Sequence, residues 1–456
     1  MEYFRQAINA LAFFVLIKIF SRLKNSAFFV IIFSVLNFFS FFAIIFSVEK
    51  IIAKIKEGIK MTPIARPLYL KRVESMINTE FIKIITGVRR SGKSYLLLMI
   101  KDKLLEMGIK EEQIIYINFE DPAFFDLLTY KDLYKYLKEK VISDQKVYFL
   151  FDEIQEVEGW QKLINGLRIA FDSDIYITGS NASLLSGDLA TYLTGRYVEI
   201  KMLPLTFKEY LHFKNLEQGD PSRYFNEYLE YGGFPSVVLQ DNSQLKKDVL
   251  AGIYNSILLK DVAGRATIKN TEVLERIALF LLSNCGQLIS INKIANTLRS
   301  AGFKVSNNTI ENYINLLQSA FLFYKVPRYD IRGKEYLRGQ GKYYAVDLGF
   351  IRSKLQRNNI NRGSKIENLV FLELLSRGYE VFVGKYQDKE VDFVAQKDQE
   401  IKYIQVTDQI PKNSRESDNL LHLPNAYQKI IITNNWDDVG NIDGIDVIHI
   451  IDFLTE

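Results

Sequence analysis

Residues 81–94 read FIKIITGVRRSGKS, a short apolar run that passes directly into a glycine-containing loop. The run 81–86 is rich in β-branched residues, which is typical of a buried strand. The loop fits the spacing GxxxxGK[ST], and a helix-forming stretch, residues 95–107, follows it. In this strand, loop and helix context the spacing forms a phosphate-binding loop. The sequence therefore predicts an α/β fold built around residues 87–94.

Each part of this loop has a chemical role in phosphate binding. Glycines let backbone N–H groups close around phosphate oxygens, and the following helix N-terminus adds positive partial charge. We expect Lys93 to reach the β- and γ-phosphates of ATP and the Ser94 hydroxyl to ligate Mg²⁺. The predicted nucleotide-binding residues are the whole loop: Gly87, Val88, Arg89, Arg90, Ser91, Gly92, Lys93 and Ser94.

A second buried strand, residues 147–151, ends in Asp152 and Glu153. An acidic residue at this position holds the Mg²⁺ shell, and the next one can polarise the attacking water. The alternative is an ordinary strand end with an aspartate cap. Residues 114–118 and 174–178 are two more strand-like runs, and the second leads to Asn181, a polar residue that could sense the γ-phosphate. With helical patterns between them, at 131–142 and 157–171, these strands predict a doubly wound parallel sheet.

Several motifs occur together in one order: GVRRSGKS, FLFDEIQ, ITGSNASLLS, LTGRY and YLEYGGFP. In this combination the chain resembles an archaeal and bacterial family of AAA+-like P-loop ATPases. The resemblance covers roughly residues 61–456. It implies a P-loop ATPase domain at 61–230, linker helices and a winged helix at 231–345, and a PD-(D/E)XK nuclease-like domain at 346–456. It also implies a sensor role for Asn181 and a phosphate-sensing or finger role for Arg196. Oligomerisation is compatible with the sequence, which does not determine the oligomeric state.

The middle of the chain is basic, with 15 Lys and Arg against 7 Asp and Glu over residues 246–345. Helical patterns at 272–284, 290–300 and 307–319 precede two strand-like stretches, 321–326 and 342–346, an order that predicts a winged helix. The wing carries the positive charge, at Lys325, Arg328, Arg332, Lys334, Arg338 and Lys342. This pattern favours DNA as a partner, contacted at its phosphates through residues 325–342. The alternatives are a solvated basic loop packed on an acidic neighbour, a lid, or a protein contact.

The last segment has the helix and strand order of a nuclease-like core. Glu367 lies in a helical stretch, residues 364–376, and Asp392 lies in a strand-like stretch, residues 390–395. By resemblance these are the first two metal-binding positions. A hairpin turn near 397–398 places Gln405 across from Asp392, where the nuclease family has glutamate, and Thr407 replaces its lysine. The segment is therefore predicted to be nuclease-like in fold with an impaired site, and a structural acid pair is the alternative.

The first sixty residues differ in composition from the rest. They hold 8 Lys and Arg, 3 Asp and Glu, and 12 of the 32 Phe, and residues 26–48 contain no charge. A run of this length predicts a membrane-anchoring hydrophobic helix, or a hairpin with the apolar run at 7–17. The remainder would then be a cytoplasmic domain anchored by residues 26–48. If translation starts at Met61 instead, the whole protein is expected to be cytoplasmic.

Composition excludes several other classes of protein. The 456 residues contain one cysteine, so neither a disulfide framework nor a cysteine-built zinc site can form. Three functional hypotheses remain. The first is a Mg²⁺-dependent ATPase that acts on DNA or is regulated by it. The second is a nucleotide-switched DNA- or protein-binding regulator with little turnover. The third and weakest is an ATP-dependent nuclease.

Overall fold

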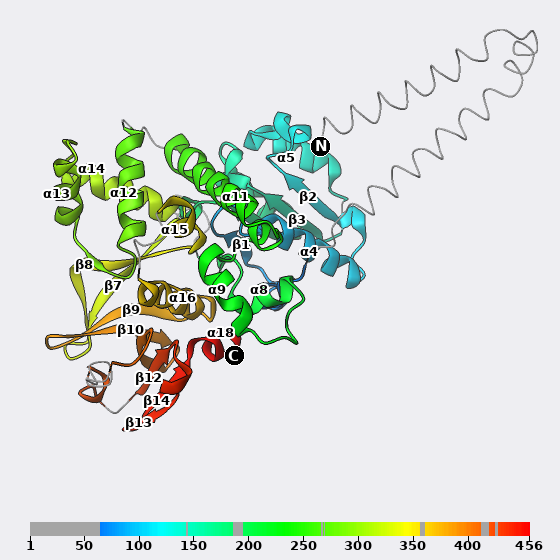
Figure 1. The fold of residues 1–456 in the computed structure, drawn as a ribbon. Coiled ribbons are helices and arrows are strands. Elements are labelled where there is room, and N and C mark those ends of the chain that lie inside the picture. Colours follow the sequence, from blue (N-terminus) through cyan, green and yellow to red (C-terminus); the bar gives the residue numbers. More distant parts are fainter. Residues whose placement is uncertain are drawn as a thin grey trace, which may run out of the picture. The chain divides into compact units, whose positions relative to one another are not determined.

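The computed structural model describes residues 64–142, 145–185, 195–265, 268, 270–355, 361–411, 419–424 and 427–456 (Figure 1). Residues Ile64–Glu456 form one compact unit. Two sheets organise this unit, one of five strands and one of nine strands.

The five-stranded sheet is parallel throughout and has the order β2-β3-β4-β1-β5. Its strands are β1 (Ile82–Thr86), β2 (Ile114–Asn118), β3 (Val147–Asp152), β4 (Ser173–Gly179) and β5 (Tyr197–Lys201). The central strands β1 and β3 are buried along their whole length, because helices cover both faces of the sheet. The predicted α/β sheet is therefore present, and β5 is a strand that the sequence pattern did not indicate.

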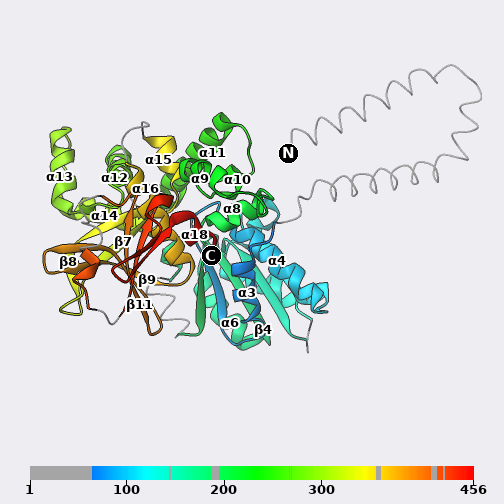
Figure 2. The ribbon, with the colours of Figure 1, turned by 60° about the horizontal axis from the view of Figure 1, so that its bottom comes forward.

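Helices on the two faces of this sheet build two separate cores. On one face α3 (Pro67–Glu74) and α4 (Lys93–Glu106) pack against Ile85, and on the other α5 (Tyr130–Lys140) and α6 (Trp160–Ala170) pack against Ile84. Figure 2 shows α3, α4 and α6 beside the sheet. Consecutive side chains of β1 thus enter opposite cores, as the twofold period of a strand requires. This packing holds the loop after β1 at the carboxyl edge of the sheet.

A set of helices follows the first sheet. They are α8 (Phe207–Phe213), α9 (Ser222–Tyr231), α10 (Pro235–Val238), α11 (Ser243–Ser256), the π-helical turn η5 (Ile257–Val262), α12 (Thr271–Ser283), α13 (Ile291–Ser300), α14 (Asn307–Ser319), α15 (Gly349–Lys354), α16 (Arg362–Ser376) and α18 (Ile450–Thr455). Short turns are η1 (Glu111–Gln113), η2 (Pro122–Leu127), η3 (Ile154–Glu156), η4 (Ala182–Leu185), η6 (Ala263–Arg265) and η7 (Trp436–Asp438).

The motif YLEYGGFP has a structural explanation. A Cβ on Gly232, whose φ is 73°, would lie 1.8 Å from Oδ1 of Asp347, so only glycine fits there. The Asp347 carboxylate accepts hydrogen bonds from the backbone N–H groups of Gly233 (2.7 Å) and Gly349 (2.8 Å). Burial raises the pKa of Asp347 to about 7, although these two hydrogen bonds oppose the shift. The motif therefore joins the segment between α9 and α10 to the start of α15.

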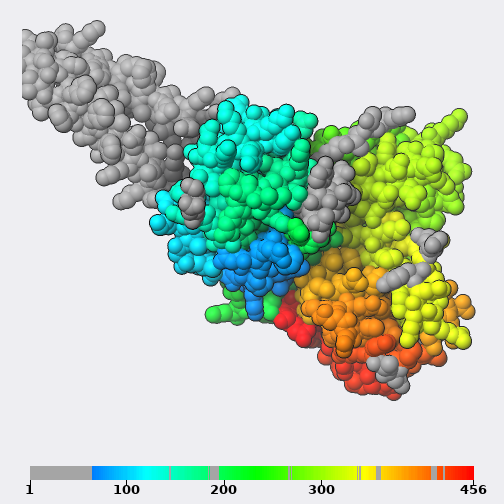
Figure 3. Space-filling model, turned by 180° about the vertical axis from the view of Figure 1, so that it is seen from behind, coloured from blue at the N-terminus to red at the C-terminus, as the bar shows by residue number. Residues whose placement is uncertain are grey.

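The nine-stranded sheet has the order β13-β14-β12-β11-β10-β9-β7-β8-β6. Its strands are β6 (Leu288–Ile289), β7 (Phe323–Asp330), β8 (Glu335–Ala345), β9 (Glu380–Tyr386), β10 (Lys389–Lys397), β11 (Glu400–Thr407), β12 (Gln428–Thr433), β13 (Gly440–Ile442) and β14 (Ile445–His449). Parallel pairing of Arg328 with Val383 joins the β7–β8 hairpin to the strands that follow residue 346, and the two groups lie side by side in Figure 3. The predicted domain boundary at 345 and 346 thus falls within one continuous sheet.

One part of the predicted fold class is wrong as stated, because it included an N-terminal hydrophobic helix or hairpin. Within the ranges given above, no helix is both long and apolar enough to cross a bilayer. The segment on which that prediction rested, residues 1–60, lies outside the described residues, as does the predicted anchor at 26–48. The fold class of the residues that the structure describes is therefore α/β with a parallel P-loop sheet.

Candidate nucleotide site

The phosphate-binding loop connects β1 to α4 and depends on positive φ angles. Gly87 (φ 147°), Arg90 (φ 69°) and Gly92 (φ 104°) lie in this region, and Gly92 is the N-cap of α4. A Cβ on Gly87 would lie 2.1 Å from the carbonyl oxygen of Met202, so a side chain there would collide with the backbone. The first turn of α4 leaves backbone N–H groups without intrahelical partners at the loop. This geometry is suited to binding an anion.

A buried arginine, Arg66, holds the phosphate-binding loop in place. Arg66 makes an ion pair of 2.6 Å with Glu209 and donates hydrogen bonds to the carbonyl oxygens of Ser91 (3.0 Å) and Leu203 (2.8 Å). Burial opposes the charge of Arg66, but Glu209 raises its pKa above the ordinary value. Glu209 also caps the N-terminus of α8. The loop is therefore tied to an element more than a hundred residues further along the chain.

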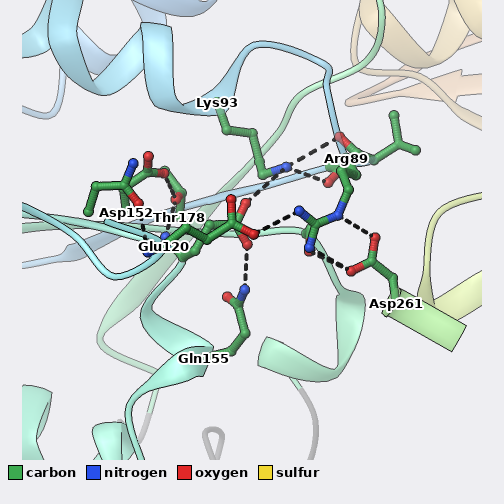
Figure 4. A network of polar contacts seen from close by, with 12 residues as sticks. Arg89, Lys93, Glu120, Asp152, Gln155, Thr178 and Asp261 are labelled. Atoms are coloured by element: carbon green, nitrogen blue, oxygen red, sulfur yellow. Dashed lines mark hydrogen bonds and ion pairs between the residues drawn. The ribbon is translucent and has the colours of Figure 1, made fainter. Parts of the chain in front are cut away.

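Lys93, the first residue of α4, is 4% exposed and faces the loop. Its Nζ donates hydrogen bonds to the carbonyl oxygens of Gly87 (3.1 Å) and Val88 (3.2 Å), and it lies 3.8 Å from Glu153 Oε1 (Figure 4). Burial lowers the pKa of Lys93, while Glu153 and Asp152 act in the opposite direction. An anionic ligand at the loop would favour the charged form of this lysine.

Asp152 ends β3 and lies beside the end of β4. Its Oδ1 accepts a 2.5 Å hydrogen bond from the Thr178 hydroxyl, and Thr178 Oγ1 accepts one from the backbone N–H of Glu153 (2.9 Å). Asp152 Oδ2 is buried and accepts no hydrogen bond from the residues that the structure describes. Burial raises the pKa of Asp152, and the hydroxyls of Ser94 and Thr178 oppose that shift. Thr178 is a contact that the sequence motifs did not single out.

Glu153 follows β3 in a left-handed conformation, with φ 54°. Such angles are uncommon for residues other than glycine and cluster at functional sites. The conformation directs the buried Glu153 carboxylate toward Lys93, and the side-chain amide of Gln155 donates a hydrogen bond to Glu153 Oε2. The carboxylate predicted to activate water therefore lies beside the lysine of the phosphate-binding loop.

Asn181 is buried at the end of β4, but its side-chain Nδ2 donates to the backbone oxygen of Asp261 at 3.3 Å. The Ser180 hydroxyl donates to Asp261 Oδ1 at 3.2 Å. Arg89 of the loop makes a two-pronged ion pair with the same carboxylate, at 3.0 and 3.1 Å (Figure 4). Burial opposes the charge of Arg89, but its bonds to Asp261 and Glu120 raise its pKa. Sequence motifs did not point to Asp261, which lies 172 residues after Arg89.

Arg196 is placed away from the loop of its own chain. It is exposed, and its carbonyl oxygen accepts a hydrogen bond from the backbone N–H of Ile82, at the start of β1. The loop begins after Thr86, at the other end of that strand, roughly 13 Å away at about 3.3 Å per residue. The structure therefore does not bring Arg196 together with Lys93 and Asp152.

The acidic pair of the last segment surrounds a lysine. Lys342 Nζ, on β8, lies 2.8 Å from Glu367, 3.0 Å from Glu390 and 3.1 Å from Asp392. Gln405 adjoins Asp392, because β10 and β11 pair in the predicted register, with Phe393 opposite Ile404. Burial alone would lower the pKa of Lys342, but the three carboxylates raise it.

This lysine changes the interpretation of two predictions. The ammonium occupies the position between Glu367 and Asp392 that a cation would take, and Lys342 is only 4% exposed. Among the residues that the structure describes, no group of three or more His, Cys, Asp or Glu is arranged to hold a metal ion. Lys342 is therefore not part of the exposed basic wing to which it was assigned. Lys325, Arg332 and Lys334 are exposed, and Arg328 is half-buried.

Comparisons with known proteins agree with this geometry. A family model described as an AAA domain matches residues 79–211, and a domain of unknown function (DUF8612) matches residues 222–361. The fold and the first match show that residues 79–211 form an AAA domain with a phosphate-binding loop.

Two relatives extend this assignment over most of the chain. An uncharacterized protein of Haemophilus influenzae is 50% identical over 396 residues, which are 86% of this chain and 99% of the relative. The uncharacterized protein MJ1544 of Methanocaldococcus jannaschii is 32% identical over 407 residues, covering 86% of this chain and 87% of the relative. The chain belongs to the family of these two proteins.

A solved structure, the Walker-type ATPase of Pyrococcus abyssi, is similar to part of this chain. The similar region covers 64% of this chain and 95% of the chain in that structure, with 16% sequence identity and a TM-score of 0.45.

Proposed function

We propose that this protein hydrolyses ATP at the loop between β1 and α4. One observation carries the proposal: Glu153 is held in a left-handed conformation with its carboxylate 3.8 Å from Lys93, the lysine of the phosphate-binding loop. The γ-phosphate of ATP would be bound by Lys93, so Glu153 would face it. Buried carboxylates beside a phosphate-binding lysine are arranged for hydrolysis more than for binding alone.

The remaining residues have distinct proposed roles. The backbone of residues 87–94 binds the phosphate oxygens, with the N-terminus of α4 supplying positive partial charge. Glu153 orients the attacking water and accepts its proton. Thr178 fixes Asp152 and Glu153 relative to one another through its hydroxyl. Gln155 holds the Glu153 carboxylate in place.

The site also suits a magnesium ion. Asp152 Oδ2 is a buried oxygen that makes no hydrogen bond of standard geometry within the described ranges, and the Ser94 hydroxyl is near enough to Asp152 to lower its pKa. Hard oxygen ligands of this kind are the ones that Mg²⁺ prefers. Asp152 and Ser94 would hold it, and the bound ion would neutralise charge on the phosphate oxygens.

Replacement of Glu153 by glutamine tests the hydrolytic step. We expect turnover to fall by about a hundredfold or more, because a general base contributes roughly 10²–10⁴ in rate. Nucleotide affinity should stay within about threefold, since the phosphate-binding loop is unchanged. Steady-state phosphate release and binding of a fluorescent ATP analogue measure the two quantities.

Glu158→Gln is the matched control for this variant, because Glu158 is an exposed carboxylate five residues further along the chain. It should leave both quantities unchanged. Native turnover in Glu153→Gln would show that another residue activates the water.

A second proposed function is DNA binding by the hairpin β7–β8. Two observations favour it: Lys325, Arg332 and Lys334 expose positive charge on this hairpin, and a groove of about 290 Å³ runs between it and α14. The polar lining of that groove comprises Ser290, Glu311, Asn315, Gln318, Lys325 and Gln340. Exposed lysine and arginine beside amide side chains are typical of a surface that contacts phosphates. ATP turnover would then act on DNA or respond to it.

Reversal of two charges, Arg332→Glu with Lys334→Glu, tests the DNA surface. We expect duplex affinity to fall by about tenfold or more, and the dependence of log K on log salt to weaken by about two. The control reverses Lys138 and Lys140, two exposed residues at the end of α5. Equal losses in both double variants would contradict a specific role for the hairpin.

ATPase rates of the native protein, measured with and without duplex DNA, distinguish an enzyme from a nucleotide-switched regulator. An ATPase rate that changes with duplex DNA supports an enzyme coupled to DNA. A negligible rate with and without DNA, together with nucleotide-dependent DNA affinity, would favour the nucleotide-switched regulator.

A further inference from the structure

The nucleotide site includes a residue from outside the segment that the AAA-domain model matches. Asp261 lies in the π-helical turn η5, within residues 222–361 rather than 79–211. Its side chain is 1% exposed, and it contacts two parts of the site at once. One part is the phosphate-binding loop, through Arg89, and the other is the end of β4, through Ser180 and Asn181.

The geometry of these contacts is specific. Both oxygens of Asp261 pair with Arg89, through Nε and Nη2, and a guanidinium held at two points has a fixed orientation. The carboxylate and the backbone oxygen accept from neighbouring side chains, Ser180 at 3.2 Å and Asn181 at 3.3 Å. One residue thus fixes the distance between the loop and the β4 terminus.

The helix that carries Asp261 also shares an apolar core with the loop. Val88, the second residue of the loop, is fully buried and belongs to the same extended apolar core as Ile257 and Val262 of η5. The local i to i+5 winding of η5 continues α11, and π-helical turns of this kind occur often at functional sites. An ion pair therefore joins η5 to the loop, and both segments contribute to one apolar core.

We propose that Asp261 is a positioning residue for ATP hydrolysis. It acts through Arg89 and through Ser180 and Asn181, and it sets the loop and the β4 terminus in the arrangement that the reaction requires. The inference rests on the proposed ATPase activity. Because Asp261 reaches the loop only when η5 is docked, the site is complete only in that arrangement.

Asp261→Asn tests this proposal, because asparagine keeps the size of the side chain and removes its charge. We expect kcat to fall by about tenfold or more with KM for ATP changed by less than about threefold, since misplacement slows the reaction more than it weakens binding. Glu120→Gln is the matched control: Glu120 also pairs with Arg89, at 2.9 Å, but is 44% exposed. It should leave kcat within about twofold.

A second variant and a double-mutant cycle test whether Asp261 has only a structural role. Ser180→Ala removes one donor to Asp261 without leaving an unpaired charge, and it should lower kcat by about threefold at unchanged urea midpoint. Arg89→Ala with Asp261→Asn should be no slower than the slower single variant, because the two residues act through one bridge.

The outcomes distinguish this proposal from the proposed function. If the wild-type protein hydrolyses ATP no faster than Lys93→Ala does, the result contradicts both the proposed function and this inference. Native turnover in Asp261→Asn, with an active wild type, would overturn this inference alone. If Asp261→Asn does not fold, an unchanged kcat in Ser180→Ala overturns it, and a lowered kcat supports it.

Discussion

Lys93→Ala is expected to abolish ATP hydrolysis and to weaken nucleotide affinity by about a hundredfold or more. The ammonium group is the buried positive charge of the phosphate-binding loop, and its hydrogen bonds to Gly87 and Val88 hold it there. Losing one preorganised donor in a water-poor site costs roughly 10²–10³ in rate, and here the donor also carries a charge. Phosphate release and fluorescent-nucleotide binding measure the two losses.

The control for this variant is Lys101→Ala, on the same helix. Lys101 pairs with Glu111 at 2.9 Å on the surface, so its removal changes the charge of α4 without touching the loop. We expect native turnover and affinity in that control. Native turnover in Lys93→Ala would show that residues 87–94 are not the nucleotide site.

Lys342→Met is expected to lower the free energy of unfolding by about 3–5 kcal/mol, because it leaves buried carboxylates without their cation. Glu367, Glu390 and Asp392 all lie within 3.1 Å of the lysine Nζ, and their mutual repulsion would no longer be compensated. Urea unfolding measures the loss. Lys402→Met is the control, since the ion-pair partner of Lys402 is the half-exposed Glu400 at 3.1 Å, and it should lose about 1 kcal/mol or less.

The size of this loss should depend on pH. Burial and Asp392 already raise the pKa of Glu367 to about 7 while Lys342 opposes them, so removing the lysine raises it further. Above the ordinary pKa of a glutamate, the unfolded chain releases the proton of Glu367, whereas the folded variant keeps it up to the raised pKa. Stability of Lys342→Met relative to the native protein should therefore fall as pH rises from 5 to 8. A loss that is equal at both pH values would contradict the repulsion between carboxylates.

Local patterns predicted much of the fold. The strand at 114–118 was predicted at the residues where β2 lies, and the predicted helices at 272–284 and 307–319 match α12 and α14 within a residue. Buried strands are continuous apolar runs and capped helices have polar starts, so both leave a signal in a short window. Ser306 gives α14 such a polar start, because its hydroxyl accepts a hydrogen bond from the backbone N–H of Thr309.

Contacts between distant segments could not be predicted in this way. Lys342 was counted with the basic wing because its neighbours in sequence are basic, whereas its environment is set by α16 and β10. Asp261 lies in an ordinary helical sequence, and only the fold places it at the loop. Arg196 received its role from a family motif, and the pairing of β5 with β1 places it at the opposite end of the strand.

The shared sheet limits how any signal from the nucleotide site can move the second half of the protein. The hairpin β7–β8 has a partner on both sides, β9 next to β7 and β6 next to β8. Turning the hairpin on its own would break backbone hydrogen bonds along two strand edges, each of which contributes roughly 0.5–1.5 kcal/mol. Rotation of the hairpin must therefore carry β9 and the C-terminal strands with it. A small displacement at η5 would then move the hairpin and the rest of the nine-stranded sheet as one rigid body.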